Sequence, residues 1–158
     1  MRYTLFIYIV LAVSILSLTA CRHRPLYYHY EDTPAGGWDR TDTLHFTVPA
    51  MTDDGRYSIQ LGLCTDNGYP YRNLSIVVQH IVLPSRQVRN DTIYCDVIDE
   101  AGHPLGDGIS RYQYLLPLTS LSLKKGESLQ FSIYHNMRRE ILPHVSSVGV
   151  LVDKEIPI

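Results

Sequence analysis

Apolar and polar residues alternate along much of this chain, and this alternation constrains the fold more than any other feature. In the segment 43–48, Leu44, Phe46 and Val48 share one side, and Thr43, His45 and Thr47 share the other. A period of two residues is that of a β-strand with one buried face. The same pattern predicts six further strands, at 57–64, 73–83, 92–98, 111–118, 129–135 and 147–153.

Glycine, Asp and Asn residues lie between these segments, as reversing chains require. They include Asp53-Asp54-Gly55, Asp66-Asn67-Gly68 and a glycine-rich stretch from Gly102 to Gly108. Only the segment 134–142 suits a helical turn, and Pro143 limits it. Regularly spaced strands without long helices predict an all-β chain that folds as a single antiparallel β-sandwich, Ig-like or jelly-roll. The pattern leaves the strand order open.

The first residues have the order of an export signal. Arg2 is followed by an apolar run to Leu18 and then by Leu18-Thr19-Ala20-Cys21. This arrangement is typical of a secretory signal peptide, and its last four residues match a bacterial lipobox, in which the cysteine takes a diacylglycerol. The alternative is an uncleaved membrane helix, for which a span needs roughly 20 residues and this run is of borderline length. The place of Cys21 and the polar residues Arg22, His23 and Arg24 after it favour the lipoprotein.

These features divide the chain into three parts. We expect a lipoprotein signal peptide at 1–20, a lipidated N-terminus and tether at 21–37, and a β-sandwich domain at 38–158. Cys21 is the predicted lipidation site. Within the tether, Tyr27, Tyr28 and Tyr30 are candidates for a first short strand.

The net charge bears on the class of partner, and the cysteines bear on whether the chain contains a disulfide. The net charge of −2 is spread along the chain, so it gives no support to a nucleic-acid partner. Besides Cys21, the chain carries Cys64 and Cys95. An oxidising compartment favours their pairing in a disulfide, whereas the alternative is two separate thiols buried as small apolar groups.

No familiar catalytic or phosphate-binding motif is present, so we expect no catalytic residues, no cofactor and no small-molecule substrate. His45, His80 and His135 lie in predicted strands, where a hydrogen-bonded or solvent-facing ring is commoner than a metal ligand, and we expect no metal site. The acidic residues around the glycine-rich stretch have two interpretations, a calcium site or a capped turn; we favour the turn. These residues are Asp96, Asp99, Glu100 and Asp107.

Aromatic residues suggest a second class of function. Trp38 and the loop Tyr69-Pro70-Tyr71, with Tyr94, Tyr112 and Tyr114 in strands, resemble the stacking platforms of glycan-binding sandwiches. The alternative is that these rings pack in loops and in the core. A glycan-binding lipoprotein accessory to an uptake system is therefore the second hypothesis.

The order of several short motifs resembles the GldH family of gliding-motility lipoproteins of the Bacteroidota. The similarity covers most of the chain beyond the lipobox. It departs from the family pattern at His103-Pro104-Leu105 and at Pro143-His144. The matching residues are Trp38, Asp42, Phe46, Tyr69-Pro70-Tyr71-Arg72-Asn73-Leu74, Asp91-Thr92-Ile93, Asp99, Gly102, Gly106, Gly108, Met137-Arg138, Leu142, Val145 and Val148-Gly149-Val150.

The resemblance implies a non-enzymatic outer-membrane lipoprotein that contributes to gliding motility, or to envelope assembly or secretion, through contacts with envelope proteins. Basic residues follow Cys21, where surface-exported lipoproteins of this phylum often carry acidic ones, so we expect the domain to face the periplasm. Unusual loop chemistry is where binding concentrates. The candidate partner-contact residues are Tyr69, Tyr71, Arg72, Asn73, Gly102, Gly106 and Gly108.

Overall fold

The computed structural model describes residues 25–156, which form strands, turns and loops and contain no helix. The predicted signal peptide and Cys21 lie outside these residues. The strands in the described part are β1 (Tyr27–Asp32), β2 (Trp38–Asp39), β3 (Leu44–Val48), β4 (Gly55–Asp66), β5 (Asn73–Leu83), β6 (Gln87–Asp96), β7 (Asp107–Gly108), β8 (Arg111–Leu123), β9 (Ser128–His135), β10 (Ile141–Leu142) and β11 (Val145–Lys154).

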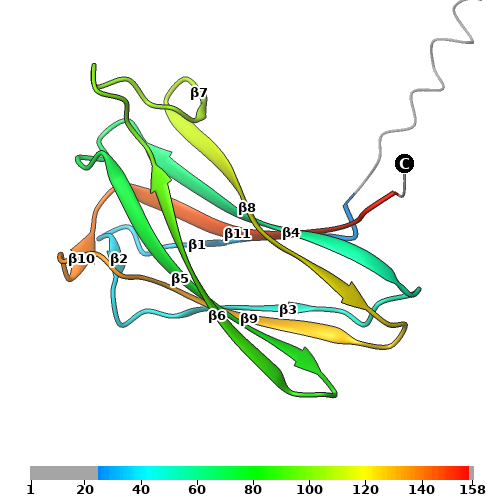
Figure 1. Cartoon of the computed structure of the whole chain (residues 1–158). Coiled ribbons are helices and arrows are strands. Elements are labelled where there is room, and N and C mark those ends of the chain that lie inside the picture. Colours follow the sequence, from blue (N-terminus) through cyan, green and yellow to red (C-terminus); the bar gives the residue numbers. More distant parts are fainter. Residues whose placement is uncertain (1–24, 157–158) are drawn as a thin grey trace, which may run out of the picture.

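Two antiparallel sheets lie face to face (Figure 1). One sheet has the order β1-β11-β4-β8-β7 and the other has the order β3-β9-β5-β6. A two-stranded ribbon of β2 and β10 closes one end. The prediction of an all-β antiparallel sandwich is therefore confirmed.

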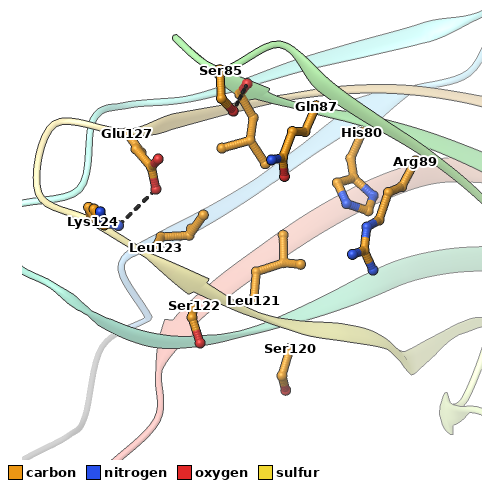
Figure 2. A pocket seen from close by; sticks show the side chains of 11 residues that line it. His80, Ser85, Gln87, Arg89, Ser120, Leu121, Ser122, Leu123, Lys124 and Glu127 are labelled. Atoms are coloured by element: carbon orange, nitrogen blue, oxygen red, sulfur yellow. Dashed lines mark hydrogen bonds between the residues drawn. The ribbon is translucent and has the colours of Figure 1, made fainter.

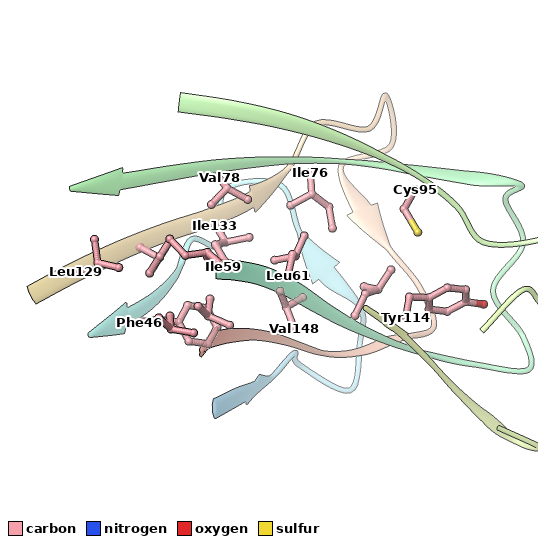
Figure 3. Packing of buried hydrophobic residues seen from close by; sticks show 14 of the residues in the cluster. Phe46, Ile59, Leu61, Ile76, Val78, Cys95, Tyr114, Leu129, Ile133 and Val148 are labelled. Atoms are coloured by element: carbon pink, nitrogen blue, oxygen red, sulfur yellow. The ribbon is translucent and has the colours of Figure 1, made fainter. Parts of the chain in front are cut away.

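The alternating apolar residues of both sheets meet in the space between them (Figure 3). Ile59 and Leu61 of β4 face Ile76 and Val78 of β5 across this core, and each of these side chains is buried. Burying one such side chain contributes about 1.5–3 kcal/mol. The period-two pattern thus predicts correctly which face of these strands is buried.

The sandwich begins at Tyr27, within the segment 21–37 that the sequence analysis assigned to the tether. Strand β1 pairs with β11 from Tyr27 opposite Val152 to Asp32 opposite Ser147. The first strand suggested by the tyrosines is therefore present. Strand β6 begins at Gln87, five residues before the predicted strand 92–98. The pattern did not indicate its first half, because Gln87, Arg89 and Asp91 are polar at positions where a buried strand carries apolar residues.

Strand β1 is fitted to the sheet by a pair of glycines. Gly62 of β4 lies opposite Gly149 of β11, and Tyr30 lies opposite Gly149 on the other side. The Tyr30 ring covers both glycines, and its hydroxyl accepts a hydrogen bond of 2.7 Å from Gln113 Nε2. An aromatic ring laid across strand glycines is a known device for filling the space that they leave.

Gly149→Ala is expected to lower the free energy of unfolding by about 1–3 kcal/mol, because overpacking has this cost. The new Cβ would lie 2.6 Å from Cγ of Tyr30. Gly36→Ala is the matched control, since nothing lies within 4 Å of the Cβ that it adds. Urea denaturation measures both variants, and equal stabilities for the two would contradict the assigned packing.

The two ends of the sandwich differ. Both ends of the described chain lie at one of them, here called the terminal end, together with the turns 49–54, 84–86 and 124–127 (Figure 1). The opposite end, here called the loop end, carries the connections 33–37, 67–72, 97–106 and 136–140. In the described part of the chain, no helix has the length and apolar character that crossing a bilayer requires.

Candidate functional site

Backbone hydrogen bonds fix the long connection between β6 and β8 to its neighbour at the loop end. The amides of Val97 and Ile98 both donate to the carbonyl of Arg72, at 2.8 and 3.1 Å. The Leu105 amide then donates to the Val97 carbonyl at 2.9 Å. Because these bonds hold the two connections as one unit, the loop end presents an ordered surface.

Asp99 forms the turn at the centre of this connection. Its carboxylate accepts hydrogen bonds from the amides of Ala101 (2.9 Å) and His103 (2.8 Å), and it lies 3.3 Å from the His103 ring. The His103 amide, with further support from the Ala101 amide, lowers the pKa of Asp99. These contacts favour the capped-turn interpretation, and no cluster of three or more metal-binding side chains occurs in residues 25–156.

Tyr69 was predicted as a partner contact, but it is only 5% exposed and belongs to the core. Its hydroxyl donates to the Asn73 carbonyl at 3.1 Å, so this ring holds the loop from inside. Burial raises the pKa of Tyr69. Tyr71 packs edge-on against it with ring centroids 5.6 Å apart, and remains half-buried.

Arg72 and Asn73 are exposed, as their prediction as contacts requires. The Arg72 guanidinium lies 3.6 Å from the Glu100 carboxylate, across the two connections. Exposed ion pairs of this kind contribute little to stability. Both charges therefore remain available for a partner.

The three predicted glycines have different roles. A Cβ on Gly106 would lie 2.7 Å from the Tyr114 ring, and Gly108 has a φ of 147° with the Arg111 carbonyl against it. A side chain at either position would collide with neighbouring atoms of the same chain, so these two glycines are required by the path of the backbone. Gly102 is exposed, and nothing lies within 4 Å of the position that a Cβ would take. Its φ of 88° is the conformation that glycine adopts readily in a tight turn.

Two exposed aliphatic side chains on the connection between β6 and β8 were not predicted as contacts. Leu105 is 55% exposed and Ile109 is 90% exposed, and both lie close to the glycines of the same connection. The signal in the sequence was their place in a glycine-rich loop outside the alternating strands, since loops run over the surface. Together with Tyr71, Arg72 and Glu100, these two side chains form what we call the loop-end surface.

Two hollows lie at the loop end, and the residues of the loop-end surface line neither of them. One, of about 320 Å³, lies between the 67–72 and 97–106 connections, and the other, of about 520 Å³, lies beside residues 32–37 and 143–146. Asp66 lines both, and its carboxylate lies 3.7 Å from Arg111 Nε. The loop end is therefore uneven as well as ordered.

The aromatic residues do not form the row that a glycan platform needs. Trp38 and Tyr114 are buried with Tyr69 in the core, and Tyr112 is half-buried with its hydroxyl bonded to the Ile109 carbonyl. Only Tyr94 among the residues suggested for stacking is largely exposed, at 78%. The packing interpretation is the one that the structure supports for these rings.

Of the two alternatives for Cys64 and Cys95, a disulfide or two separate thiols, the structure has the second, since both thiols are free. Cys95 lies inside the core on β6, and burial raises its pKa to about 11. Cys64 lies on β4 in the opposite phase to the buried Leu61 and Leu63, so it points to the outer face of its sheet. A disulfide cannot form through a sheet, because its Cβ atoms must come within about 4.5 Å.

A family model described as GldH lipoprotein matches residues 25–152. A curated relative, the gliding motility lipoprotein GldH of Flavobacterium johnsoniae, is 23% identical over 101 residues. That alignment covers 64% of this chain and 62% of the relative, so the match spans less than two thirds of the relative's length.

A solved structure of a family GH115 4-O-methyl-α-glucuronidase, with specificity for decorated arabinogalactans, also matches. It is 11% identical with a TM-score of 0.50, and the alignment covers 86% of this chain and 18% of the enzyme. At this identity the likeness concerns the sandwich fold alone.

Proposed function

The chain belongs to the GldH lipoprotein family, and from this membership we propose that it is a non-enzymatic outer-membrane lipoprotein that supports gliding motility, or a linked secretion step, by docking envelope proteins. Membrane association through a lipid and a link to gliding motility follow from the family and from the curated relative. The outer membrane, the orientation toward the periplasm and the docking itself are our proposals.

The geometry gives this proposal a definite arrangement. Tyr27 follows Cys21 by six residues, and a chain of that length reaches about 20 Å at most. An acylated Cys21 therefore keeps the terminal end of the sandwich close to the bilayer. Strand β11 has ten residues, which corresponds to a length of about 33 Å, so the loop end is separated from the anchored end by about that distance.

The single observation that carries docking is the exposure of Leu105 and Ile109 on a connection fixed by backbone hydrogen bonds. Exposed apolar side chains with charged neighbours are typical of protein-interaction surfaces. The charged pair of Arg72 and Glu100 lies on the same two connections, and we include it in this surface.

Lipidation is tested by replacing Cys21. We expect Cys21→Ser to abolish incorporation of a labelled fatty acid, because the lipid attaches through the thiol. Each buried methylene of an acyl chain contributes about 0.8 kcal/mol of membrane binding. Metabolic labelling followed by purification of the protein measures the effect.

Cys64→Ser is the matched control, because Cys64 is the partly exposed thiol of the described chain. We expect it to keep full labelling. Unchanged labelling of Cys21→Ser would contradict the anchor. The orientation has a separate test, since protease added to intact cells is expected to leave the domain uncut if it faces the periplasm.

A further inference from the structure

Four histidines lie in strands of the described residues, and His80 is the one among them that has no hydrogen-bond partner. His135 Nε2 donates to the Trp38 carbonyl at 3.0 Å, and His45 is exposed beside Ser132. His80 is 1% exposed, yet both of its ring nitrogens lack a hydrogen bond. The nearest carboxylate, that of Asp91, lies 3.7 Å from Nδ1, which is beyond hydrogen-bond distance.

An unpaired buried polar group is costly, so its presence needs a physical reason. Burial lowers the pKa of His80, so the ring is neutral near pH 7 and offers one N–H donor and one acceptor. The ring packs against Phe131 with centroids 6.0 Å apart, which fixes its position. Something outside the described contacts is needed to satisfy the two nitrogens.

His80 lines a pocket of about 390 Å³ between the two sheets, at the open edge formed by β6 and β8 (Figure 2). Leu121 and Leu123 of β8, with Val82 of β5, form an apolar wall. Arg89 and Gln87 of β6 extend over the opening beside His80. The volume lies at the small end of the range for ligand sites, which suits a molecule with a single ring.

The lining carries two cationic side chains, Arg89 and Lys124, and neither makes an ion pair with a carboxylate of the described residues. The Arg89 guanidinium lies beside the His80 ring (Figure 2). On the far side, the Glu127 carboxylate accepts a hydrogen bond of 2.8 Å from the Lys124 amide. Of the two cations, Arg89 is the one beside His80, and its planar fork matches a carboxylate, so we assign the anion to Arg89.

Inward polar residues can also protect an edge strand from pairing with another chain. Gln87, Arg89 and Asp91 occupy such positions on β6, opposite Val82, His80 and Val78. Edge protection accounts for these three residues, but it does not account for the buried histidine on the inner strand. His80 and the pocket therefore call for a ligand as well.

We propose that this pocket binds a small hydroxylated carboxylic acid, the size of one sugar-acid ring, with its carboxylate on Arg89. The body of the ligand packs on Leu121, Leu123 and Val82, while its hydroxyl groups bond to His80, Gln87 and Glu127. Arg89 and Gln87 are exposed side chains, so they can turn aside to uncover the His80 nitrogens. The site lies at the terminal end, so it is separate from the docking proposed for the loop end.

The test is calorimetric titration of the full-length lipidated protein in detergent with D-glucuronate and with D-glucose. These probes differ only at the carbon that carries the carboxylate. We expect saturable binding of D-glucuronate and binding of D-glucose that is at least about tenfold weaker, since hydrogen bonds to charged groups contribute this much or more. Equal binding of the two, or no saturable binding of D-glucuronate, overturns the proposal.

Two variants locate the binding. Arg89→Ala is expected to weaken D-glucuronate binding about tenfold or more, whereas Arg139→Ala, an exposed arginine of the loop end, leaves it unchanged. His80→Phe is expected to weaken binding without lowering the thermal midpoint, because it removes the unpaired nitrogens and keeps a ring against Phe131. Should His80→Phe fail to fold, Arg89→Ala decides the question alone.

A third probe distinguishes the type of anion. Inorganic phosphate is expected to displace D-glucuronate only weakly, since it has no body to pack on the apolar wall. Stronger binding of phosphate than of D-glucuronate, or binding that Arg89→Ala leaves intact, contradicts the assignment. Because the site and the loop-end surface lie at opposite ends, failure here leaves the docking proposal untouched.

Discussion

Trp38→Ala is expected to lower the free energy of unfolding by about 3–5 kcal/mol, as removal of a fully buried large aromatic side chain does. Trp38 lies in the ribbon that closes the loop end, opposite Leu142. Its ring stands edge-on to His135 at 5.1 Å, and its Nε1 donates to the Asp42 carbonyl at 2.9 Å. The substitution leaves a cavity and also removes the hydrogen bond that holds the segment before β3.

Chemical denaturation followed by circular dichroism measures this loss. Tyr94→Ala is the control, because Tyr94 is largely exposed and its removal is expected to change stability by about 0.5 kcal/mol or less. Trp38→Phe keeps part of the ring and is expected to fall between the two. A loss below about 1.5 kcal/mol for Trp38→Ala would show that this ring does not anchor the loop end.

Leu105→Asp combined with Ile109→Asp is expected to abolish function in the cell while leaving the fold intact. Hot-spot side chains of an interface contribute 2 kcal/mol or more each, so loss of one weakens docking by about 30-fold, and loss of both weakens it further. Both side chains are exposed, so the thermal midpoint is expected to stay within a few degrees of the parent. The readout is complementation of a gene deletion, scored by colony spreading and by the content of secreted proteins.

The matched control is the pair Val88→Asp and Leu115→Asp, two aliphatic side chains that are also exposed but lie outside the loop end. We expect this pair to restore spreading and secretion to the level of the parent. Equal complementation by the two double variants would place the functional surface elsewhere. Loss in both would point to a general effect of added charge.

Much of the fold could be predicted from the sequence because the core-forming strands have one polar and one apolar face. Along β4, alternation places Tyr57, Ile59, Leu61 and Leu63 inward, and the structure agrees. The same alternation already put Cys64 out of phase with these residues, whereas Cys95 is in phase with Ile93. The phase of the two strands therefore predicted the separation of the two thiols better than the redox compartment did.

Other features depend on contacts between distant segments, which the local pattern does not contain. Tyr69 lies in a loop of small and polar residues, and its burial follows from packing near Cys95 and Tyr71. The short strands β2 and β10 exist only because Trp38 and Leu142 meet across more than 100 residues. In the sequence, His80 occupies an ordinary inward position of the strand. Only the three-dimensional arrangement shows that its two ring nitrogens have no hydrogen-bond partner.

Photo-crosslinking in living cells tests the central claim most directly. A photoreactive amino acid is placed at position 109, on the loop-end surface, or at position 125, an exposed site at the terminal end. The account predicts a discrete crosslinked envelope protein from position 109 and none of that mass from position 125. Crosslinks to the same protein from position 125 alone, or none from position 109, would contradict docking through the loop end.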